Sequence, residues 1–443
     1  MAYDYSSRRA VLKTTGAVGA AGLAGLAGCL GNGDGEEQIG NYPPEGDSVT
    51  FGLNAPQSGL LAPDGIPQFD AFEMAIDHLN NGGGWVDEWD ELSGDGVLDY
   101  EVEGVDADSG GDGDQSVENI ERMIEQDNIQ MWTGGVSSGV AEALQPVAQR
   151  ENVPYMVNLS TSNLITGEHV TRYSFRTAAP TYMLGLACAS VLPDELGDDL
   201  DFYQIYLDYS FGITGRESML EGFEDVGWTE VGEQSIPEGE MDYSAHLADA
   251  QDSGADVVIL STFGDALTNA LEQAADAGIT DEMDIIVTTM SNFSLEPASE
   301  NIEDVYGTTD WTADRGDEYS DIFVEEYESE FGETPGFAPK LVYENVMLYA
   351  EAVERAGTFF PPDVVRELED YEYDHTGVGD AELRECDHQA HRMVPVVRGL
   401  SEEDQEETGQ FVELVDEAPR EDTTYGCDEG PAADADMGEY GDE

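Results

Sequence analysis

The sequence predicts an α/β fold made of two doubly wound lobes, with a hinge and a ligand cleft between them. Short β-prone runs alternate with helix-length amphipathic segments, a pattern typical of parallel sheets covered by helices on both faces. The alternation occurs in two sets, one on each side of residues 176–180. The chain of 443 residues is also longer than one hydrophobic core usually serves, which favours two domains.

The first set starts with a β-prone run at 49–53 and a helical apolar spacing at 66–79, which the run of Asn and Gly at 80–84 ends. The elements that follow in this set are strand 97–105, helix 114–125, strand 129–133, helix 140–150 and strand 153–157. Each strand is followed by a helix, so the strands are expected to run parallel.

The second set repeats the pattern. Its elements are strand 202–207, helix 214–226, strand 229–233, helix 243–252, strand 256–260, helix 266–277 and strand 285–288. Helices at 319–331 and 341–356 follow, then a strand-like stretch from 391. In such sheets ligands lie beyond the carboxyl ends of the strands. Two facing sheets therefore predict a cleft that closes by a hinge motion.

The domain boundaries follow from these two sets. We expect the first lobe to comprise residues 48–177 plus 308–374, and the second lobe 178–307 plus 375–415. Residues 416–443 are rich in acids and poor in apolar runs, which predicts a loose acidic tail.

The N-terminus has the features of an export signal. Arg8 and Arg9 precede an uncharged Ala/Gly-rich stretch at 14–28, which is shorter than the roughly 20 apolar residues of a membrane-spanning helix. The paired arginines resemble a twin-arginine signal. Leu26-Ala27-Gly28-Cys29 resembles a lipobox. We therefore predict a Tat-type lipoprotein signal peptide at 1–28, a lipid on Cys29, a flexible tether at 29–47 and a location on the extracellular face of the cell membrane. A plain signal peptide with an accidental cysteine is the alternative.

The charge of the chain is extreme. There are 97 Asp and Glu residues against 16 Lys and Arg, a formal net charge of −81. A disordered acidic chain would contain few hydrophobic residues, whereas 40% of these residues are hydrophobic. Self-repulsion of this size needs screening by counterions, which favours a folded protein of a halophilic archaeon. Nucleic acid is excluded as a partner, because binding phosphate backbones requires basic patches.

Three of the four cysteines remain after Cys29 is assigned to lipid. Cys188 lies in an apolar helical run at 183–192, which predicts a buried free thiol. Cys386 and Cys427 are predicted to form a disulfide, which persists in exported proteins. A zinc site is the competing interpretation, but neither cysteine has a second thiol at the usual spacing.

Five segments, in order along the chain, carry a family likeness. They are the strand and Ser-Gly loop at 49–59, the loop at 134–138, the strand and turn at 154–161, the Asp-Tyr-Ser-Phe-Gly turn at 208–212 and the Arg-Glu-Cys-Asp-His-Gln element at 384–389. Together they resemble the type I solute-binding proteins of ABC transporters, the leucine/isoleucine/valine-binding protein family. The likeness covers about 48–400.

The resemblance implies a periplasmic-binding-protein-like type I fold with two Rossmann-like lobes. It implies a monomeric binding protein without cofactor, metal or enzymatic activity. Such a protein closes on a small amino acid-like solute, a branched-chain amino acid or a related amide or carboxylate. It then delivers the solute to ABC permease and ATPase subunits. A ligand-sensing subunit of a signalling receptor is the alternative function.

The resemblance also implies a set of ligand-binding residues. They are Ser58, Ser137, Ser138, Ser160, Thr161, Phe211, Phe263 and Met290. Ser138 opens the helix expected at 140–150, and helix N-termini favour anions; a simple N-cap is the alternative for this serine. Ser160 and Thr161 could form an ordinary turn, and Phe211 and Phe263 could be core aromatics.

One departure from the family pattern concerns the ligand. Amino-acid binders place an acid after the strand that is expected here from Ile285 to Thr289, and this chain has Met290-Ser291-Asn292 there. A buried ammonium group without a partner costs several kcal/mol. Asp208 or Asp265 could substitute, but a neutral amide, a carboxylate or an aromatic acid suits the residues as well.

Few residues of the sequence suggest an enzyme or a metal site. Asp387, His388 and His391 could suggest a metal site, but residues three apart on a strand face opposite sides. The sequence contains neither a Gly-x-Ser-x-Gly elbow nor a P-loop. We therefore expect neither a metal site nor an enzyme.

Overall fold

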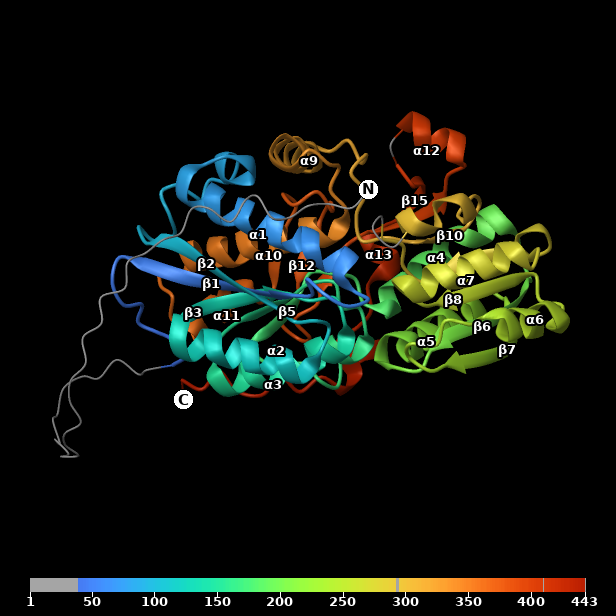
Figure 1. Ribbon diagram of the computed structural model, residues 1–443. Helices are drawn as coiled ribbons and strands as arrows, with labels where there is room; N and C mark the ends of the chain where they lie inside the picture. The colour runs from blue at the N-terminus through green and yellow to red at the C-terminus, as the bar shows by residue number, and fades with distance from the viewer. Residues whose placement is uncertain (1–38, 292–294, 409, 443) are drawn as a thin grey trace. The chain divides into compact units, whose positions relative to one another are not determined.

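The computed structural model describes residues 39–291, 295–408 and 410–442 (Figure 1). The predictions for the signal peptide and for Cys29 lie outside these residues. The part of the tether that is described, 39–47, packs on the first lobe: the Asn41 side-chain amide donates to the carbonyl oxygens of Ile124 and Ile129 at 3.2 and 2.9 Å. The prediction of a flexible tether at 29–47 is therefore wrong for residues 39–47.

The first lobe is built on a parallel five-stranded sheet in the order β2-β1-β3-β4-β5. Its strands are β1 (Ser48–Ala55), β2 (Glu101–Asp108), β3 (Ile129–Gly134), β4 (Tyr155–Val157) and β5 (Ser174–Arg176). Helices α1 (Ala62–Asn81) and α10 (Phe337–Ala356) cover one face, and α2 (Gly113–Arg122) and α3 (Ser138–Glu151) cover the other (Figure 1). All six residues of β3 are buried, as expected of a parallel strand covered on both faces.

The second lobe contains a seven-stranded sheet in the order β15-β14-β10-β9-β8-β6-β7. Its strands are β6 (Asp201–Leu207), β7 (Thr229–Ile236), β8 (Val257–Ser261), β9 (Asp284–Val287), β10 (Tyr306–Thr308), β14 (Val394–Gly399) and β15 (Val412–Ala418). Its parallel part, in the order β7-β6-β8-β9-β10, corresponds strand by strand to the order β2-β1-β3-β4-β5 of the first lobe. Its helices are α4 (Thr181–Leu196), α5 (Ser210–Asp225), α6 (Ser244–Ser253) and α7 (Asp265–Asp276). The predicted two-lobed α/β fold is confirmed.

One predicted strand starts too early. Val97 makes only an isolated bridge with Tyr100, and β2 begins at Glu101 instead of 97. Leu98 and Asp99 between them have positive φ values of 49° and 66°, which belong to a tight turn and not to a strand. Alternation of apolar residues cannot distinguish such a turn from the strand that follows it.

The boundary between the lobes differs from the prediction near residue 375. A small antiparallel sheet of β11 (Tyr371–Tyr373), β12 (Ala381–Leu383) and β13 (Ala390–His391) follows α9 (Glu318–Phe331), α10 and α11 (Pro361–Leu368). Buried residues of β12 and β13 join the hydrophobic core of the first lobe. Residues 375–391 therefore belong to the first lobe, and the second lobe resumes at β14.

The C-terminal residues are more ordered than the loose tail predicted from 416. Strand β15 continues to Ala418, and α12 (Glu402–Thr408) and α13 (Arg420–Thr423) flank it. The predicted disulfide between Cys386 and Cys427 is confirmed, and Tyr425 beside it is only 6% exposed. Near the end of the chain, the carbonyl oxygen of Met437 accepts a hydrogen bond from the backbone N–H of Arg172 at 2.7 Å. The last segment thus connects the second lobe back to the first.

Two further findings concern the described residues. Cys188 is a buried free thiol, as predicted. No helix within the described ranges combines the length and apolar character needed to cross a membrane.

Candidate ligand-binding site

A pocket lies where the two lobes meet, at the carboxyl ends of the parallel strands. Its space, including the open mouth, is about 310 Å³. The first lobe contributes Leu61, Val136, Ser137, Ser138, Leu159 and Thr161, and the second lobe contributes Tyr209, Phe211, Phe263 and Thr289. Each of these residues follows a strand: β1, β3 or β4 in the first lobe and β6, β8 or β9 in the second. This is the place at which doubly wound sheets bind ligands.

The first-lobe wall is formed by the N-terminus of α3 and the turn before it. Gly134 ends β3 with a φ of 108°, and a Cβ on it would lie 2.8 Å from the carbonyl oxygen of Asn54, so this turn requires glycine. Ser137 is the N-cap of α3 but makes no side-chain capping hydrogen bond. The first N–H groups of a helix have no partner inside the helix, and the helix dipole makes this end positive.

The second-lobe wall is aromatic. The rings of Phe211 and Phe263 meet edge to face with centroids 6.4 Å apart, and the ring of Tyr209 lies 5.9 Å from that of Phe211. Burial raises the pKa of Tyr209 above its usual value, so its phenol stays neutral. The hydroxyl oxygen of Thr289 is buried and has no hydrogen-bond partner among the described residues.

The structure brings together five of the eight residues that the family resemblance implied. Ser137, Ser138, Thr161, Phe211 and Phe263 line the pocket. Their contact with a ligand remains a prediction.

The other three of the eight lie outside the pocket lining. Ser58 is exposed and its hydroxyl donates to Asp108 Oδ2 at 2.8 Å. The Ser160 hydroxyl donates to the carbonyl oxygen of Ser137 at 3.0 Å, so Ser160 supports the pocket wall from behind. Met290 is 1% exposed and packs in the core of the second lobe.

Sequence reasoning missed five lining residues: Leu61, Val136, Leu159, Tyr209 and Thr289. Thr289 lies at the carboxyl end of the strand predicted from Ile285, where doubly wound sheets bind ligands. This position could have identified Thr289 as a lining residue. Neither Asp208 nor Asp265, the acids considered as substitutes for the missing carboxylate, is among the lining residues.

The two lobes contact each other beside the pocket. The hydroxyl of Ser291 donates to the buried carboxylate of Asp64, which links the second lobe to α1. The backbone N–H of Thr181, the first residue of α4, donates to the carbonyl oxygen of Thr161 at 2.8 Å. Next to it the Asn163 side chain donates to the Ser218 hydroxyl at 3.0 Å. The two lobes therefore contact each other through α1, α4, α5 and the loop after β4.

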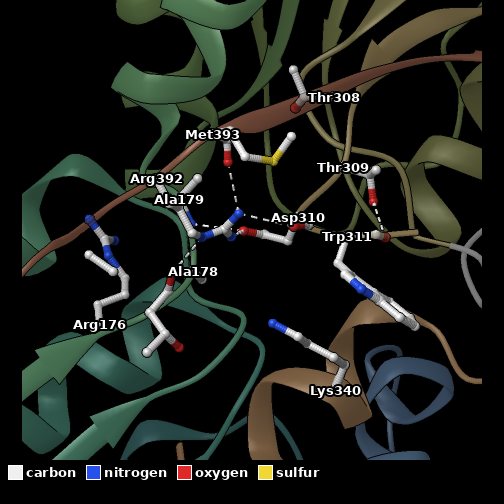
Figure 2. Close-up of polar contacts among 12 residues, drawn as sticks. Arg176, Ala178, Ala179, Thr308, Thr309, Asp310, Trp311, Lys340, Arg392 and Met393 are labelled. Atoms are coloured by element: carbon white, nitrogen blue, oxygen red, sulfur yellow. Dashed lines mark hydrogen bonds and ion pairs between the residues drawn. The ribbon is translucent and has the colours of Figure 1, made fainter. Parts of the chain in front are cut away.

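The hinge consists of three chain segments that cross between the lobes, at 177–180, 309–311 and 392–393. Figure 2 shows how one buried ion pair joins all three. Arg392 pairs with the carboxylate of Asp310 and also donates from Nε to the carbonyl oxygen of Thr177 at 3.0 Å. The same Asp310 carboxylate accepts from the backbone N–H of Ala179 at 2.8 Å. Arg392 and Asp310 are 0 and 1% exposed.

Two more buried cationic side chains, Arg176 and Lys340, lie near the Arg392–Asp310 ion pair (Figure 2). Arg176 donates from Nη1 to the carbonyl oxygens of Ser160 and Ser162 at 3.0 and 2.6 Å, which fixes the loop after β4. Burial lowers the pKa of Arg176 to about 10. Lys340 on α10 donates to Glu344 Oε2 at 2.6 Å, and both side chains are buried.

The C-terminal histidines His388 and His391 are both fully buried. His388 Nε2 lies 2.9 Å from Glu369 Oε1, and its Nδ1 lies 3.1 Å from the carbonyl oxygen of Ser174. His391 is buried, and neither of its ring nitrogens has a hydrogen-bond partner within the described ranges. Within the described part of the chain, no group of three or more His, Cys, Asp or Glu side chains is arranged to hold a metal ion.

Comparison with known proteins gives a consistent picture. Residues 48–404 match the model of a family described as periplasmic binding protein. The chain is 26% identical over 337 residues to the Leu/Ile/Val-binding protein homolog 7 of Brucella abortus (strain 2308), which covers 73% of this chain and 80% of the relative.

Two solved structures share the fold. A periplasmic binding protein from Burkholderia mallei superposes with a TM-score of 0.78 at 22% identity, covering 88% of this chain and 99% of the other. A leucine binding protein from Thermotoga maritima MSB8 gives a TM-score of 0.72 at 20% identity, with coverages of 84 and 99%.

Proposed function

The chain belongs to the periplasmic binding protein family, and we propose that it captures a small solute between its lobes for an ABC importer. The proposal rests on one observation: ten residues from both lobes converge on a single pocket at the carboxyl ends of two facing sheets. A solute that contacts both walls stabilises the closed state over the open state, which is how ligand binding drives hinge closure. The closed form is the form that permease and ATPase subunits would receive.

A thermal-shift screen followed by calorimetry tests this function. A solute that binds only the folded protein raises the melting temperature by mass action, so at least one compound in a panel of amino acids, amides, carboxylates and sugars should do so. Small-angle X-ray scattering should then show a smaller radius of gyration with that solute than without it. If no compound in the panel raises the melting temperature and the scattering never changes, the proposed function is wrong.

Variants on each wall add a second test. Thr161→Val on the first lobe and Phe211→Ala on the second should each weaken binding of the solute that the screen identifies. Ser58→Ala is the control, because its hydroxyl bonds to Asp108 outside the pocket lining, and its affinity should equal that of the wild type. Equal affinities for all three variants would show that the solute binds elsewhere.

The lipid anchor is a further part of the proposal. It is supported by the lipobox-like sequence that ends at Cys29 and by the uncharged stretch before it. Mass spectrometry of the membrane fraction should find a mature protein that begins at a lipid-modified Cys29. Recovery of peptides from 1–28 in the mature protein would contradict the anchor.

Adaptation to high salt is also proposed, as expected of a halophilic archaeon. It is supported by the composition, a net charge of −81, whereas the relatives named above come from bacteria. Circular dichroism should show loss of structure upon dialysis from molar to low salt. Light scattering in molar salt should give the mass of a monomer. A chain that keeps its full structure without salt would contradict the adaptation.

A further inference from the structure

The chemistry of the pocket narrows the class of solute, and this step rests on the proposed function. None of the ten lining residues is charged, although the chain carries 97 acidic residues. The polar lining groups are hydroxyls, from Ser137, Ser138, Tyr209, Thr161 and Thr289. Among the described residues, the acids that dominate the rest of the sequence are therefore absent from the lining, and the buried Asp64 carboxylate beside the pocket is engaged by the Ser291 hydroxyl.

The lining offers an ammonium group no strong acceptor. The carbonyl oxygens of the loop after β4 are already engaged: Ser160 and Ser162 bond to Arg176 at 3.0 and 2.6 Å, and Thr161 bonds to Thr181 at 2.8 Å. No carboxylate is among the lining residues that the structure describes, 292–294 being outside them. A buried ammonium without a carboxylate partner is strongly unfavourable, so α-amino acids do not fit this lining.

An anionic group fits one end of the pocket, and a second polar group fits the other. Ser137 leaves the first turn of α3 uncapped, and unpaired N–H groups at a positive helix end bind carboxylates. Across the pocket, the buried Thr289 hydroxyl has no partner among the described residues, and a buried polar group of this kind normally has one. The remaining lining residues are apolar: Leu61, Val136, Leu159, Phe211 and Phe263.

We infer that the pocket binds a carboxylate with an apolar or aromatic body, a polar group at its far end and no ammonium group. The carboxylate lies at the N-terminus of α3, and the far polar group reaches the hydroxyl of Thr289. The body packs against Phe211 and Phe263, whose edge-to-face arrangement leaves a ring face for stacking.

Matched solute pairs test the missing ammonium. Calorimetry in molar salt would compare 4-methylpentanoate with leucine, and 3-phenylpropanoate with phenylalanine; the members of each pair differ only in the ammonium group. We expect each carboxylate to bind at least ~100-fold more tightly than its amino acid. Equal or tighter binding of either amino acid would overturn the inference. So would binding of amides or sugars by a protein that ignores all carboxylates. The proposed function survives both of these outcomes, and it fails only when no solute of the panel binds.

A pair of threonine variants tests the far end. The probe is 3-(4-hydroxyphenyl)propanoate, compared with 3-phenylpropanoate. Thr289→Val should weaken binding of the hydroxylated probe by about 2- to 10-fold, as expected for one hydrogen bond, and leave the other probe unaffected. Thr262→Val is the matched control, because its hydroxyl is also buried and unpartnered among the described residues but does not line the pocket. Unchanged binding in Thr289→Val, or an equal loss in both variants, would overturn the assignment of Thr289.

Discussion

Substitution of Asp310 by Asn should destabilise the hinge strongly. The change keeps the shape of the side chain but removes the charge that Arg392 faces, and Arg392 is 0% exposed. Breaking a buried ion pair by removing one partner costs about 3–5 kcal/mol, because the other charge stays buried without compensation. The asparagine can still accept from the backbone N–H of Ala179, which Asp310 bonds at 2.8 Å, so the loss reports mainly on the ion pair.

Urea-induced unfolding in molar salt would measure this loss as the change in free energy of unfolding. The control is Glu413→Gln, which removes one acid from the pair of Glu413 with Arg398. Both side chains of that pair are exposed, by 44 and 39%, and such surface pairs contribute about 0–1 kcal/mol. Each variant removes one negative charge, so the relief of overall self-repulsion is the same in both and cancels in the comparison.

The double variant of Asp310→Asn with Arg392→Met completes the thermodynamic cycle. It should lose less stability than the sum of the two single variants, since it leaves no unpaired charge. If Asp310→Asn lies within about 1 kcal/mol of Glu413→Gln, the spread expected for surface pairs, the ion pair does not hold the hinge and the reasoning is refuted.

Three further predictions concern the disulfide and two buried side chains. Replacing Cys386 and Cys427 by Ser should lower the free energy of unfolding by about 4 kcal/mol, because the disulfide restricts the unfolded chain over a sequence separation of 41. Calorimetry that finds no change in the free energy of unfolding would contradict this stabilisation by the disulfide. Burial raises the pKa of the Cys188 thiol, so iodoacetamide should modify Cys188 only after denaturation, and rapid modification of the native protein would contradict its burial. Burial, with a smaller effect of Arg384, lowers the pKa of His391 from 6.5 to about 3. As the pH falls, His391 is therefore protonated in the unfolded chain before it is protonated in the folded protein. Between pH 6.5 and about 3 the free energy of unfolding of the wild type then decreases by up to about 1.4 kcal/mol per pH unit. His391→Phe should show a flatter dependence of stability on pH, and an unchanged slope would rule out His391 as its source.

The fold was predictable because its strands are short apolar runs separated by helix-length segments. Strand β8 is an example, because all five of its residues are buried and the first four, Val257 to Leu260, form an uninterrupted apolar run. Strands β11 to β13 were not predictable, because each has only two or three residues and those that are buried pack on the first lobe by long-range contacts. The order of the C-terminal segment was not predicted for the same reason. Its acidic composition indicated a loose tail, whereas it is held by long-range contacts of Tyr425 and of the backbone of Met437.

Part of the pocket lining was predictable from the family resemblance. That resemblance implied Ser137, Ser138 and Thr161, which lie three to four residues beyond the ends of β3 and β4 and line the pocket. Met290 was predicted to line the pocket, but Thr289 does so instead. Successive side chains of extended chain point in opposite directions, so an error of one residue exchanges a pocket residue for a core residue. Tyr209 enters the pocket only because the lobes meet, and no local pattern encodes that meeting.

The buried state of Lys340 has a practical consequence for work on this protein. Lysine occurs in the sequence only at 13 and 340, and the Lys340 side chain is 1% exposed. The described surface therefore carries no lysine amine for acylating dyes, amine-directed cross-linkers or amine-coupled sensor chips. Labelling through surface carboxylates, which are abundant, is the route that reaches the folded protein and leaves the uncharged pocket untouched.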